Sequence, residues 1–489
     1  MMRSAGALLQ GACLLRSLLV GRNFPKSSRW SVSGKPVVFP KLDPRGTGAV
    51  ILIAVLVAQA TDLAIRARLL NAAVMKTARS FVCLAALALL SPAPVGAQDT
   101  ATPAAAFDAA KSWSSFVQLL HENYGYFDRS GIDGNAILAA FADRAKAARS
   151  DKDFIDVLQL VSHNFADPHF VVGPLDRGDW SVIPTASDLF GIRDGKDFLI
   201  GEVRTGGEAA LKGMRPGMTV VRIDGLSPRA AVEAVTGRPF TDLSPMQIGF
   251  AFNVALAGHR NQGRLIEVRD GRRTRTCTLV ATNDLARRVE DGPLLETERQ
   301  GRLGIIRINN SLGDHRLIDA FSKALASLAD TDTVLIDLRN TPSGGNTSVA
   351  RGIMGHFVDH DRPYQMHVIP YETRVLGPTR RFVEYVAPFG TRYAGKLYVA
   401  GGRWTGSMGE GLMIGFDAIG ATTVGSDLAH LLGALSNETI EGSAAKVDIG
   451  TEQLFTVTGL PREAYRPQIY LAQAERTPEG DPALGAIER

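Results

Sequence analysis

One stretch of the chain, residues 396–416, limits most strongly the folds that the sequence can adopt. It reads KLYVAGGRWTGSMGEGLMIGF. The short apolar run Leu397–Ala400 predicts a buried strand, which the two following glycines end. From Met408 to Ala418 the apolar residues recur at helical spacing, so a helix is expected there. A strand that passes through a small-residue turn into a helix is a repeating unit of α/β proteins.

The serine in this turn, Ser407, has two interpretations. Small neighbours would let a substrate carbonyl approach it, and the start of a helix favours developing negative charge, so Ser407 is a candidate nucleophile. Ser407 and Glu410 also have the spacing of a capping box, in which the serine only caps the helix. The stretch by itself leaves both interpretations open.

The rest of the C-terminal half repeats the same alternation. Two further apolar strands are expected at Arg302–Ile308 and Thr333–Arg339, and helices at Leu317–Leu328 and Val349–Phe357. Alternating strands and helices predict an α/β layer with mostly parallel strands. The glycine turn in residues 340–346 follows a strand, as the Ser407 turn does, and active sites assemble at that edge of such a sheet. The two turns are therefore expected to face one crevice.

Composition excludes several classes of function. The 489 residues leave room for two or three domains, and a net charge of +4 without a basic, aromatic-rich run gives no case for nucleic acid binding. The three cysteines, Cys13, Cys83 and Cys277, form no CxxC pair. The histidines show no HExxH spacing. We expect neither a bound metal nor a cofactor.

The N-terminal region contains a secretion signal in an unusual place. Residues 75–97 have a basic start, an apolar core and a small-residue end, which predicts a signal peptide cleaved after Ala97 and a periplasmic or secreted location. Residues 1–74 are then a doubtful upstream extension, with translation starting at Met75. The alternative is a membrane anchor near residues 50–65.

A helical segment, residues 98–175, follows the signal. Residues 98–106 read as a linker, and helices are expected at 107–124, 136–148 and 153–164. The segment ends in ADPHF, which places His169 at a junction between a loop and a strand. A single histidine there is either structural or catalytic.

Residues 187–285 predict a small β module. A strand is expected at Phe198–Val203 and a hairpin at Leu265–Val280. Between them, Gly206–Gly225 runs from a short small-residue helix into GMRPGMTVVRIDG. This stretch resembles a PDZ domain, a module that binds extended peptides by strand addition. The loop Leu189–Ile192 falls where the carboxylate-binding turn of that family would lie.

Four motifs together resemble the tail-specific, or carboxy-terminal processing, serine proteases. They are the strand GIIRINN, the strand and turn VLIDLRNTPSGGN, the Ser407 turn with its glutamate three residues later, and the helical segment with GYFDRSGID and ADPHF. With the PDZ-like module between them, the resemblance covers nearly all of the chain after residue 97. It implies a core of the ClpP/crotonase type at 292–475 with a C-terminal tail at 476–489.

The resemblance also implies a mechanism. One branch of the family pairs serine with a lysine in a Gly-Lys-Gly turn, but the matching region here reads VGSDLAHLLG and contains no lysine. The tricorn-like branch uses serine, histidine and glutamate. The positions that match are Ser407 as nucleophile, His169 as general base and Glu463 as the residue that orients the histidine. Pro168 stands where the family often has serine or glycine.

The same resemblance implies an oxyanion hole made of backbone N–H groups. Met408 would supply one donor, and a glycine of the NTPSGGN turn would supply the other. This turn has one residue more than the common form, so the second donor is either Gly344 or Gly345. The expected partner is a protein or peptide substrate. Two alternatives stay open: a catalytically inactive relative that binds a peptide or apolar ligand, and an acyl hydrolase that does not cleave peptides.

Overall fold

The computed structural model describes residues 31–32, 35–36 and 107–487. The chain divides into two units, residues 1–99 and 100–489. In the first unit the described residues are an antiparallel pair, β1 (Ser31–Val32) and β2 (Lys35–Pro36). The predicted signal peptide, the rest of the upstream extension and the linker lie outside the described residues. Within the described part of the chain, no helix is both long and apolar enough to cross a membrane.

The described part of the second unit begins with three helices that precede His169 in the chain. They are α3 (Ala109–Asn123), α4 (Gly134–Lys146) and α5 (Asp151–Asn164). Each helix starts at a residue whose side chain accepts a backbone N–H of the first turn, namely Asp108, Asp133 and Ser150. The three predicted helices are confirmed, and each end lies within two residues of its predicted position. The chain then turns into β3 (Val171–Gly173), which pairs with a strand near the C-terminus.

The middle module is a five-stranded sheet in the order β4-β5-β6-β7-β8. Its strands are β4 (Leu189–Asp194), β5 (Asp197–Val203), β6 (Thr219–Ile223), β7 (Arg264–Asp270) and β8 (Arg273–Leu279). Its helical elements are α6 (Glu208–Leu211), α7 (Pro228–Thr236), η1 (Phe240–Asp242) and α8 (Pro245–Ala257). The expected loop at Leu189–Ile192 is wrong: these residues belong to strand β4, because they pair with β5.

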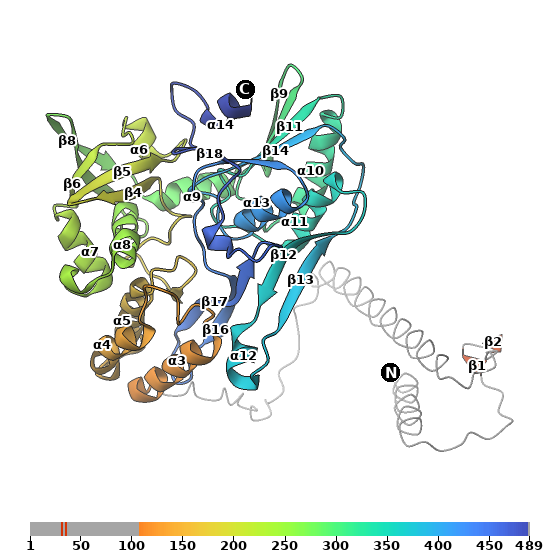
Figure 1. Ribbon diagram of the computed structural model, residues 1–489. Coiled ribbons are helices and arrows are strands. Elements are labelled where there is room, and N and C mark those ends of the chain that lie inside the picture. The colour runs from red at the N-terminus through yellow and green to blue at the C-terminus, as the bar shows by residue number, and fades with distance from the viewer. Residues whose placement is uncertain (1–30, 33–34, 37–106, 488–489) are drawn as a thin grey trace, which may run out of the picture. The chain divides into compact units, whose positions relative to one another are not determined.

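The C-terminal half contains a six-stranded sheet in the order β18-β15-β14-β11-β10-β9 (Figure 1). Its strands are β9 (Leu295–Gln300), β10 (Leu303–Ile308), β11 (Thr333–Asp337), β14 (Lys396–Gly401), β15 (Thr422–Gly425) and β18 (Ile469–Tyr470). Every neighbouring pair is parallel except β9 with β10. The predicted mixed, mostly parallel α/β architecture is therefore confirmed.

A second sheet of antiparallel strands in this half was not predicted. It has the order β13-β12-β17-β16, with β3 paired to β17. Its strands are β12 (Arg362–Val368), β13 (Arg381–Val386), β16 (Ala434–Thr439) and β17 (Lys446–Phe455). Because β3 directly follows the ADPHF motif, this sheet fixes that motif to the C-terminal half of the chain.

The remaining helical elements follow the middle module in the chain. They are α9 (Thr282–Glu290), α10 (Arg316–Ser327), α11 (Thr347–Met354), η2 (Gly355–Phe357), α12 (Pro370–Leu376), α13 (Met408–Ala418), η3 (Arg462–Ala464) and α14 (Pro482–Ile487). Helix α13 lies next to α11 (Figure 1) and has the predicted bounds. Residues Met408 to Phe416 are all buried, so α13 is a core helix and its N-terminus is held rigidly.

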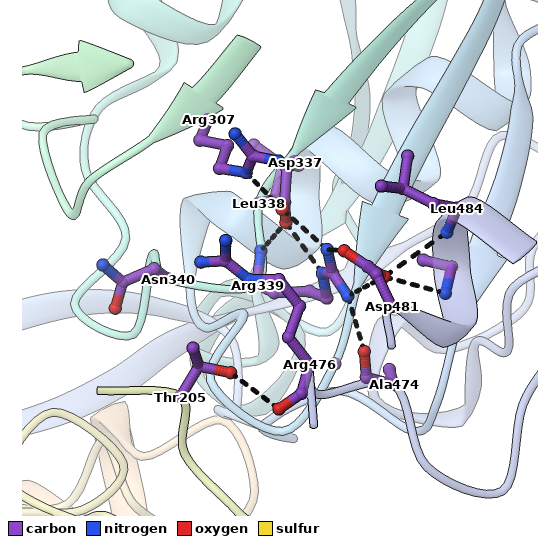
Figure 2. A network of polar contacts seen from close by, with 12 residues as sticks. Thr205, Arg307, Asp337, Leu338, Arg339, Asn340, Ala474, Arg476, Asp481 and Leu484 are labelled. Atoms are coloured by element: carbon purple, nitrogen blue, oxygen red, sulfur yellow. Dashed lines mark hydrogen bonds and ion pairs between the residues drawn. The ribbon is translucent and has the colours of Figure 1, made fainter. Parts of the chain in front are cut away.

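A buried charge network holds the turn after β11, as Figure 2 shows. The guanidinium of Arg339 forms two hydrogen bonds with Asp337 at 2.9 and 2.8 Å, and two with Asp481 at 2.8 Å each. It also donates to the carbonyl of Ala474 at 2.6 Å. Buried charges are tolerated when they are paired in this way, so the network fixes the start of the glycine turn to the C-terminal tail.

Candidate active site

Ser407 sits on a sharp turn between β14 and α13. Its backbone has φ +50° and ψ −115°, a left-handed conformation that is costly for a residue other than glycine. The Ser407 N–H donates to the Glu410 carboxylate at 2.9 Å, so the glutamate half of the predicted capping box is present. An ordinary helix cap has extended backbone angles, whereas strain of this kind clusters at functional sites.

The glycine turn after β11 lies against the Ser407 turn. Thr341 donates its N–H to the carbonyl of Trp404 at 3.0 Å, and its carbonyl accepts the N–H of Gly406 at 3.1 Å. These bonds bring together two turns that follow neighbouring parallel strands, in the arrangement that the sequence predicts for an open α/β sheet.

The two glycines of this turn have different surroundings. A Cβ on Gly344 (φ +68°) would lie 2.4 Å from the Cβ of Ser407 and 2.6 Å from the Met408 nitrogen. The missing side chain therefore lets the glycine turn pack directly against the serine and the Met408 nitrogen. The Gly344 N–H already donates to Thr341 at 3.3 Å, whereas for Gly345 no partner of the N–H occurs among the described residues. Gly345 packs against the backbone of Leu312.

His169 is 8% exposed and follows the end of α5 by five residues. Its Nδ1 lies 3.0 Å from the carbonyl oxygen of Leu432. A carbonyl can only accept, so Nδ1 carries the proton and the neutral ring has its lone pair on Nε2. Burial, together with the positive charge of Arg462, lowers the pKa of His169 to about 4. The imidazole is therefore a neutral base at pH 7.

The loop that presents His169 is itself held by buried polar groups. Asp167 is fully buried, accepts the His169 backbone N–H at 2.9 Å and accepts the Tyr124 hydroxyl at 2.9 Å. Burial raises the pKa of Asp167 to about 6. Arg129 donates to the carbonyls of Phe165 and Ala166 at 2.6 and 3.2 Å. These contacts give the histidine one backbone position.

Glu463, the third residue of the predicted triad, lies in η3. None of the hydrogen bonds in the described region joins its carboxylate to His169. One of its oxygens, Oε2, is buried and has no hydrogen-bond partner among the described residues. Glu463 instead lines a cavity of about 900 Å³ between the middle module, the helical segment and the C-terminal half. Pro168 and Leu432, which flank the histidine and its acceptor, line the same cavity.

The middle module contributes strand β4 and helix α8 to the wall of this cavity. Strand β4 lies at the edge of its sheet, and at Gly191 the side chain of Asn253 from α8 occupies the edge that no strand pairs with. The Asn253 amide accepts the Gly191 N–H at 2.8 Å and donates to the Gly191 carbonyl at 3.0 Å. A Cβ on Gly191 would lie 2.2 Å from the ring of Phe252, so only glycine allows the helix to pack this closely.

No group of three potential metal ligands gathers in the described residues. His430, the residue near the expected lysine position, has a left-handed backbone (φ +59°) and donates its N–H to Glu410 at 2.9 Å. Burial lowers the pKa of His430 to about 4.

Sequence reasoning missed four contributors to this region. Arg462 and the carbonyl of Leu432 lie in no recognisable motif, and their contacts connect distant parts of the chain. Asp167 lies in the ADPHF motif, from which only the histidine was singled out. Glu410 was visible in the sequence as a helix cap and as part of the Ser407 motif, but not as a contact of the 430–433 loop.

Comparison with known proteins identifies the fold and not a close relative. A scan of the sequence against protein-family models finds no match, and a search of curated proteins also finds none. Among solved structures, the chain is similar to a mutant of CPAF, with a TM-score of 0.51 at 12% identity over 75% of this chain and 93% of that chain. It is similarly related to mature CPAF complexed with lactacystin, with a TM-score of 0.50 at 13% identity over 75% of this chain and 94% of that chain.

A third solved structure, the photosystem II D1 C-terminal processing protease, gives a TM-score of 0.48 at 14% identity over 74% of this chain and 93% of that chain. CPAF and the D1 processing protease are tail-specific proteases. Through its likeness to CPAF, the chain therefore has the fold of the tail-specific proteases, as the four sequence motifs implied.

Proposed function

We propose that the protein is a serine endopeptidase that cleaves peptide bonds of protein substrates at Ser407. The observation that carries this proposal is a strained serine against which a glycine turn packs directly, on a fold of known proteases that also presents a neutral buried histidine. A structural cap would need neither the left-handed backbone of Ser407 nor the missing side chain at Gly344.

In the proposed reaction, Ser407 Oγ attacks the carbonyl carbon of the scissile peptide bond. The Nε2 atom of His169 takes the hydroxyl proton and later returns it to the leaving amine. Water then attacks the acyl-enzyme, with His169 acting as base again, and releases the acid product and the free serine. The lowered pKa of His169 keeps Nε2 unprotonated at neutral pH, as the first step requires.

The developing oxyanion would lie next to Gly344. The Met408 N–H, at the start of α13, is one donor for it, and the Gly345 N–H is the second. Each such donor contributes about 3–4 kcal/mol to transition-state stabilisation. The cavity lined by Pro168 and Leu432 is the proposed place for the polypeptide substrate on one side of the scissile bond.

We also propose that the protein is exported through the signal at residues 75–97, and that the middle module is PDZ-like and contacts the substrate. The five-stranded sheet with α8 against its edge strand supports this assignment. N-terminal sequencing of the mature protein from its host should begin at Gln98; a mature chain that begins upstream of Met75 would contradict the export signal.

A fluorophosphonate probe, combined with a digestion assay on unfolded casein, tests the peptidase proposal. The probe reacts only with an activated serine, and we expect peptide mapping to locate the adduct on Ser407. Peptides released from casein would then identify a peptidase. A folded chain that neither reacts nor cleaves would be the inactive relative. Labelling with ester turnover but without casein cleavage would favour the acyl hydrolase.

Replacement of Gly344 by alanine tests the close approach of the glycine turn to the serine. The new Cβ would block the Met408 N–H, and we expect kcat to fall about 100-fold or more. Gly271→Ala is a matched control, since Gly271 also has a positive φ (+59°) but has no atom within 4 Å of the added Cβ. Equal kcat values for the two variants would contradict the proposed oxyanion site.

A further inference from the structure

Three segments that are distant in the sequence lie close together at the proposed nucleophile. They are the Ser407 turn, the loop of residues 430–433 and the short helix η3. None of them is bonded to another through a sheet. Between the first two, the Ala429 N–H donates to the Thr405 carbonyl at 3.1 Å. The other hydrogen bonds that join the three segments come from side chains that reach from one segment to the next.

Glu410 connects the first two segments. Its side chain is completely buried. Oε2 accepts the N–H groups of Ser407 at 2.9 Å and Leu431 at 3.2 Å, and Oε1 accepts the N–H of His430 at 2.9 Å. A helix cap needs only the first of these bonds. The other two fix the 430–433 loop to the nucleophile turn.

Arg462 connects the third segment to the other two. It is 3% exposed, and its Nη2 lies 3.8 Å from Oε2 of Glu410. It donates to the carbonyls of Ser407 at 3.2 Å, Leu431 at 2.7 Å and Gly433 at 3.2 Å. A guanidinium can serve several acceptors at once because its donors form a rigid, planar fork.

The loop held in this way carries the acceptor for the histidine. Residues 431 and 433 are bonded to Arg462, and the carbonyl of the residue between them, Leu432, accepts the His169 Nδ1–H at 3.0 Å. Any shift of the loop relative to Ser407 would therefore rotate or displace the imidazole. Glu463, next to Arg462, has no hydrogen bond to His169 among the described residues.

We propose that Glu410 and Arg462 are positioning residues, which fix the 430–433 loop to the nucleophile turn so that the Leu432 carbonyl orients His169. This inference rests on the proposed peptidase function and departs in one part from the mechanism that the resemblance implied: the orienting acceptor is a backbone carbonyl and not the Glu463 carboxylate. When Nε2 takes the serine proton, the ring becomes an imidazolium, and its Nδ1–H bond to the carbonyl becomes charge-assisted and stronger.

Replacement of Glu410 by glutamine tests this arrangement. Glutamine has the same shape but only one carbonyl oxygen. Its NH₂ group must face either the N–H of His430 or the N–H groups of Ser407 and Leu431, and one end of the connection is lost. We expect kcat to fall about 30-fold or more, while KM stays within about threefold of the wild-type value. The reason is that the substitution displaces the histidine but leaves the substrate contacts in place. The rate constant of fluorophosphonate labelling should fall by a similar factor.

Glu475→Gln is the matched control. Glu475 is also a buried glutamate (7% exposed), and it accepts the backbone N–H and hydroxyl of Thr205 at 2.9 and 2.7 Å. Its replacement should affect thermal stability but leave kcat per labelled site within about twofold of the wild type. Arg462→Lys keeps the charge without the planar fork and should lower kcat about tenfold.

Hydrogen–deuterium exchange of the peptide that spans residues 428–434 tests the connection without reference to activity. We expect exchange there to be at least about tenfold faster in Glu410→Gln than in the wild type, since one N–H group of the loop, that of His430 or of Leu431, loses its acceptor and the loop is held less firmly. Unchanged exchange, or a folded Glu410→Gln variant with wild-type kcat and labelling rate, would overturn the proposal. Faster exchange in a chain whose wild-type form neither labels nor cleaves would refute the peptidase and retain the connection.

Discussion

Replacement of Ser407 by alanine should abolish casein cleavage and fluorophosphonate labelling while the chain stays folded. The change removes the only atom that forms the acyl-enzyme, and we expect kcat to fall at least about 1,000-fold, to the level that binding and the oxyanion hole supply alone. The Ser407 N–H bond to Glu410 is a backbone contact, so the helix start is preserved. The thermal midpoint should change little.

Ser436→Ala is the control for this variant. Ser436 is a half-buried serine on β16 whose hydroxyl donates to Glu438 at 2.8 Å, and its loss should leave cleavage unchanged. Cleavage that persists at the wild-type rate in Ser407→Ala would assign the nucleophile elsewhere. A fall of only a few-fold would identify Ser407 as a cap that stabilises α13.

Replacement of His169 by asparagine should lower kcat by a comparable factor, about 1,000-fold or more, because no other group then accepts the serine proton. The asparagine amide can still donate to the Leu432 carbonyl, so we expect the local structure to persist. Labelling by the fluorophosphonate should slow by a similar factor, since the probe also requires an activated serine. Substrate binding should change little.

His163→Asn controls for the general loss of a histidine. The Nδ1 of His163 lies 2.9 Å from the carbonyl oxygen of Val235, and burial lowers its pKa to about 4, as burial does for His169. The two histidines thus share their hydrogen-bond type and protonation state, and only one is proposed to be catalytic. Equal activity losses in both variants would show that His169 acts through stability alone.

The local sequence pattern predicted much of the fold, because most helices and strands are marked by the spacing of their own apolar residues. Helix α13 has the bounds that its apolar spacing indicated, and the strands β10, β11 and β14 were visible as short apolar runs. Helix α8 was missed because it is apolar on nearly every side, with the sequence PMQIGFAFNVALA, and shows no amphipathic period. Strand β4 was expected to be a loop, since residues 189–192 fall where the PDZ resemblance places a carboxylate-binding turn. In the structure, the glycine at position 191 permits close helix packing.

The candidate site was predictable in its parts but not in its connections. The serine, the histidine and the glycine turn each follow or precede a recognisable element, and the structure brings the glycine turn to the serine. The bonds from Glu410 to residues 430 and 431 span about twenty positions of sequence, and a helix cap explained the glutamate adequately without them. A backbone carbonyl as the histidine's acceptor leaves no signature in any sequence.

The closed edge of β4 has a consequence for the proposed contact between the middle module and a peptide. A strand that added at Gly191 would compete with the Asn253 amide, which is already bonded to both backbone groups of that residue. Apparent affinity falls in proportion to the fraction of molecules in which the edge is open, so an edge open in about 1% of molecules weakens binding about 100-fold. The module would then bind a peptide only at high local concentration. The Asn253 amide would thus raise the peptide concentration needed for binding, in addition to its role in packing.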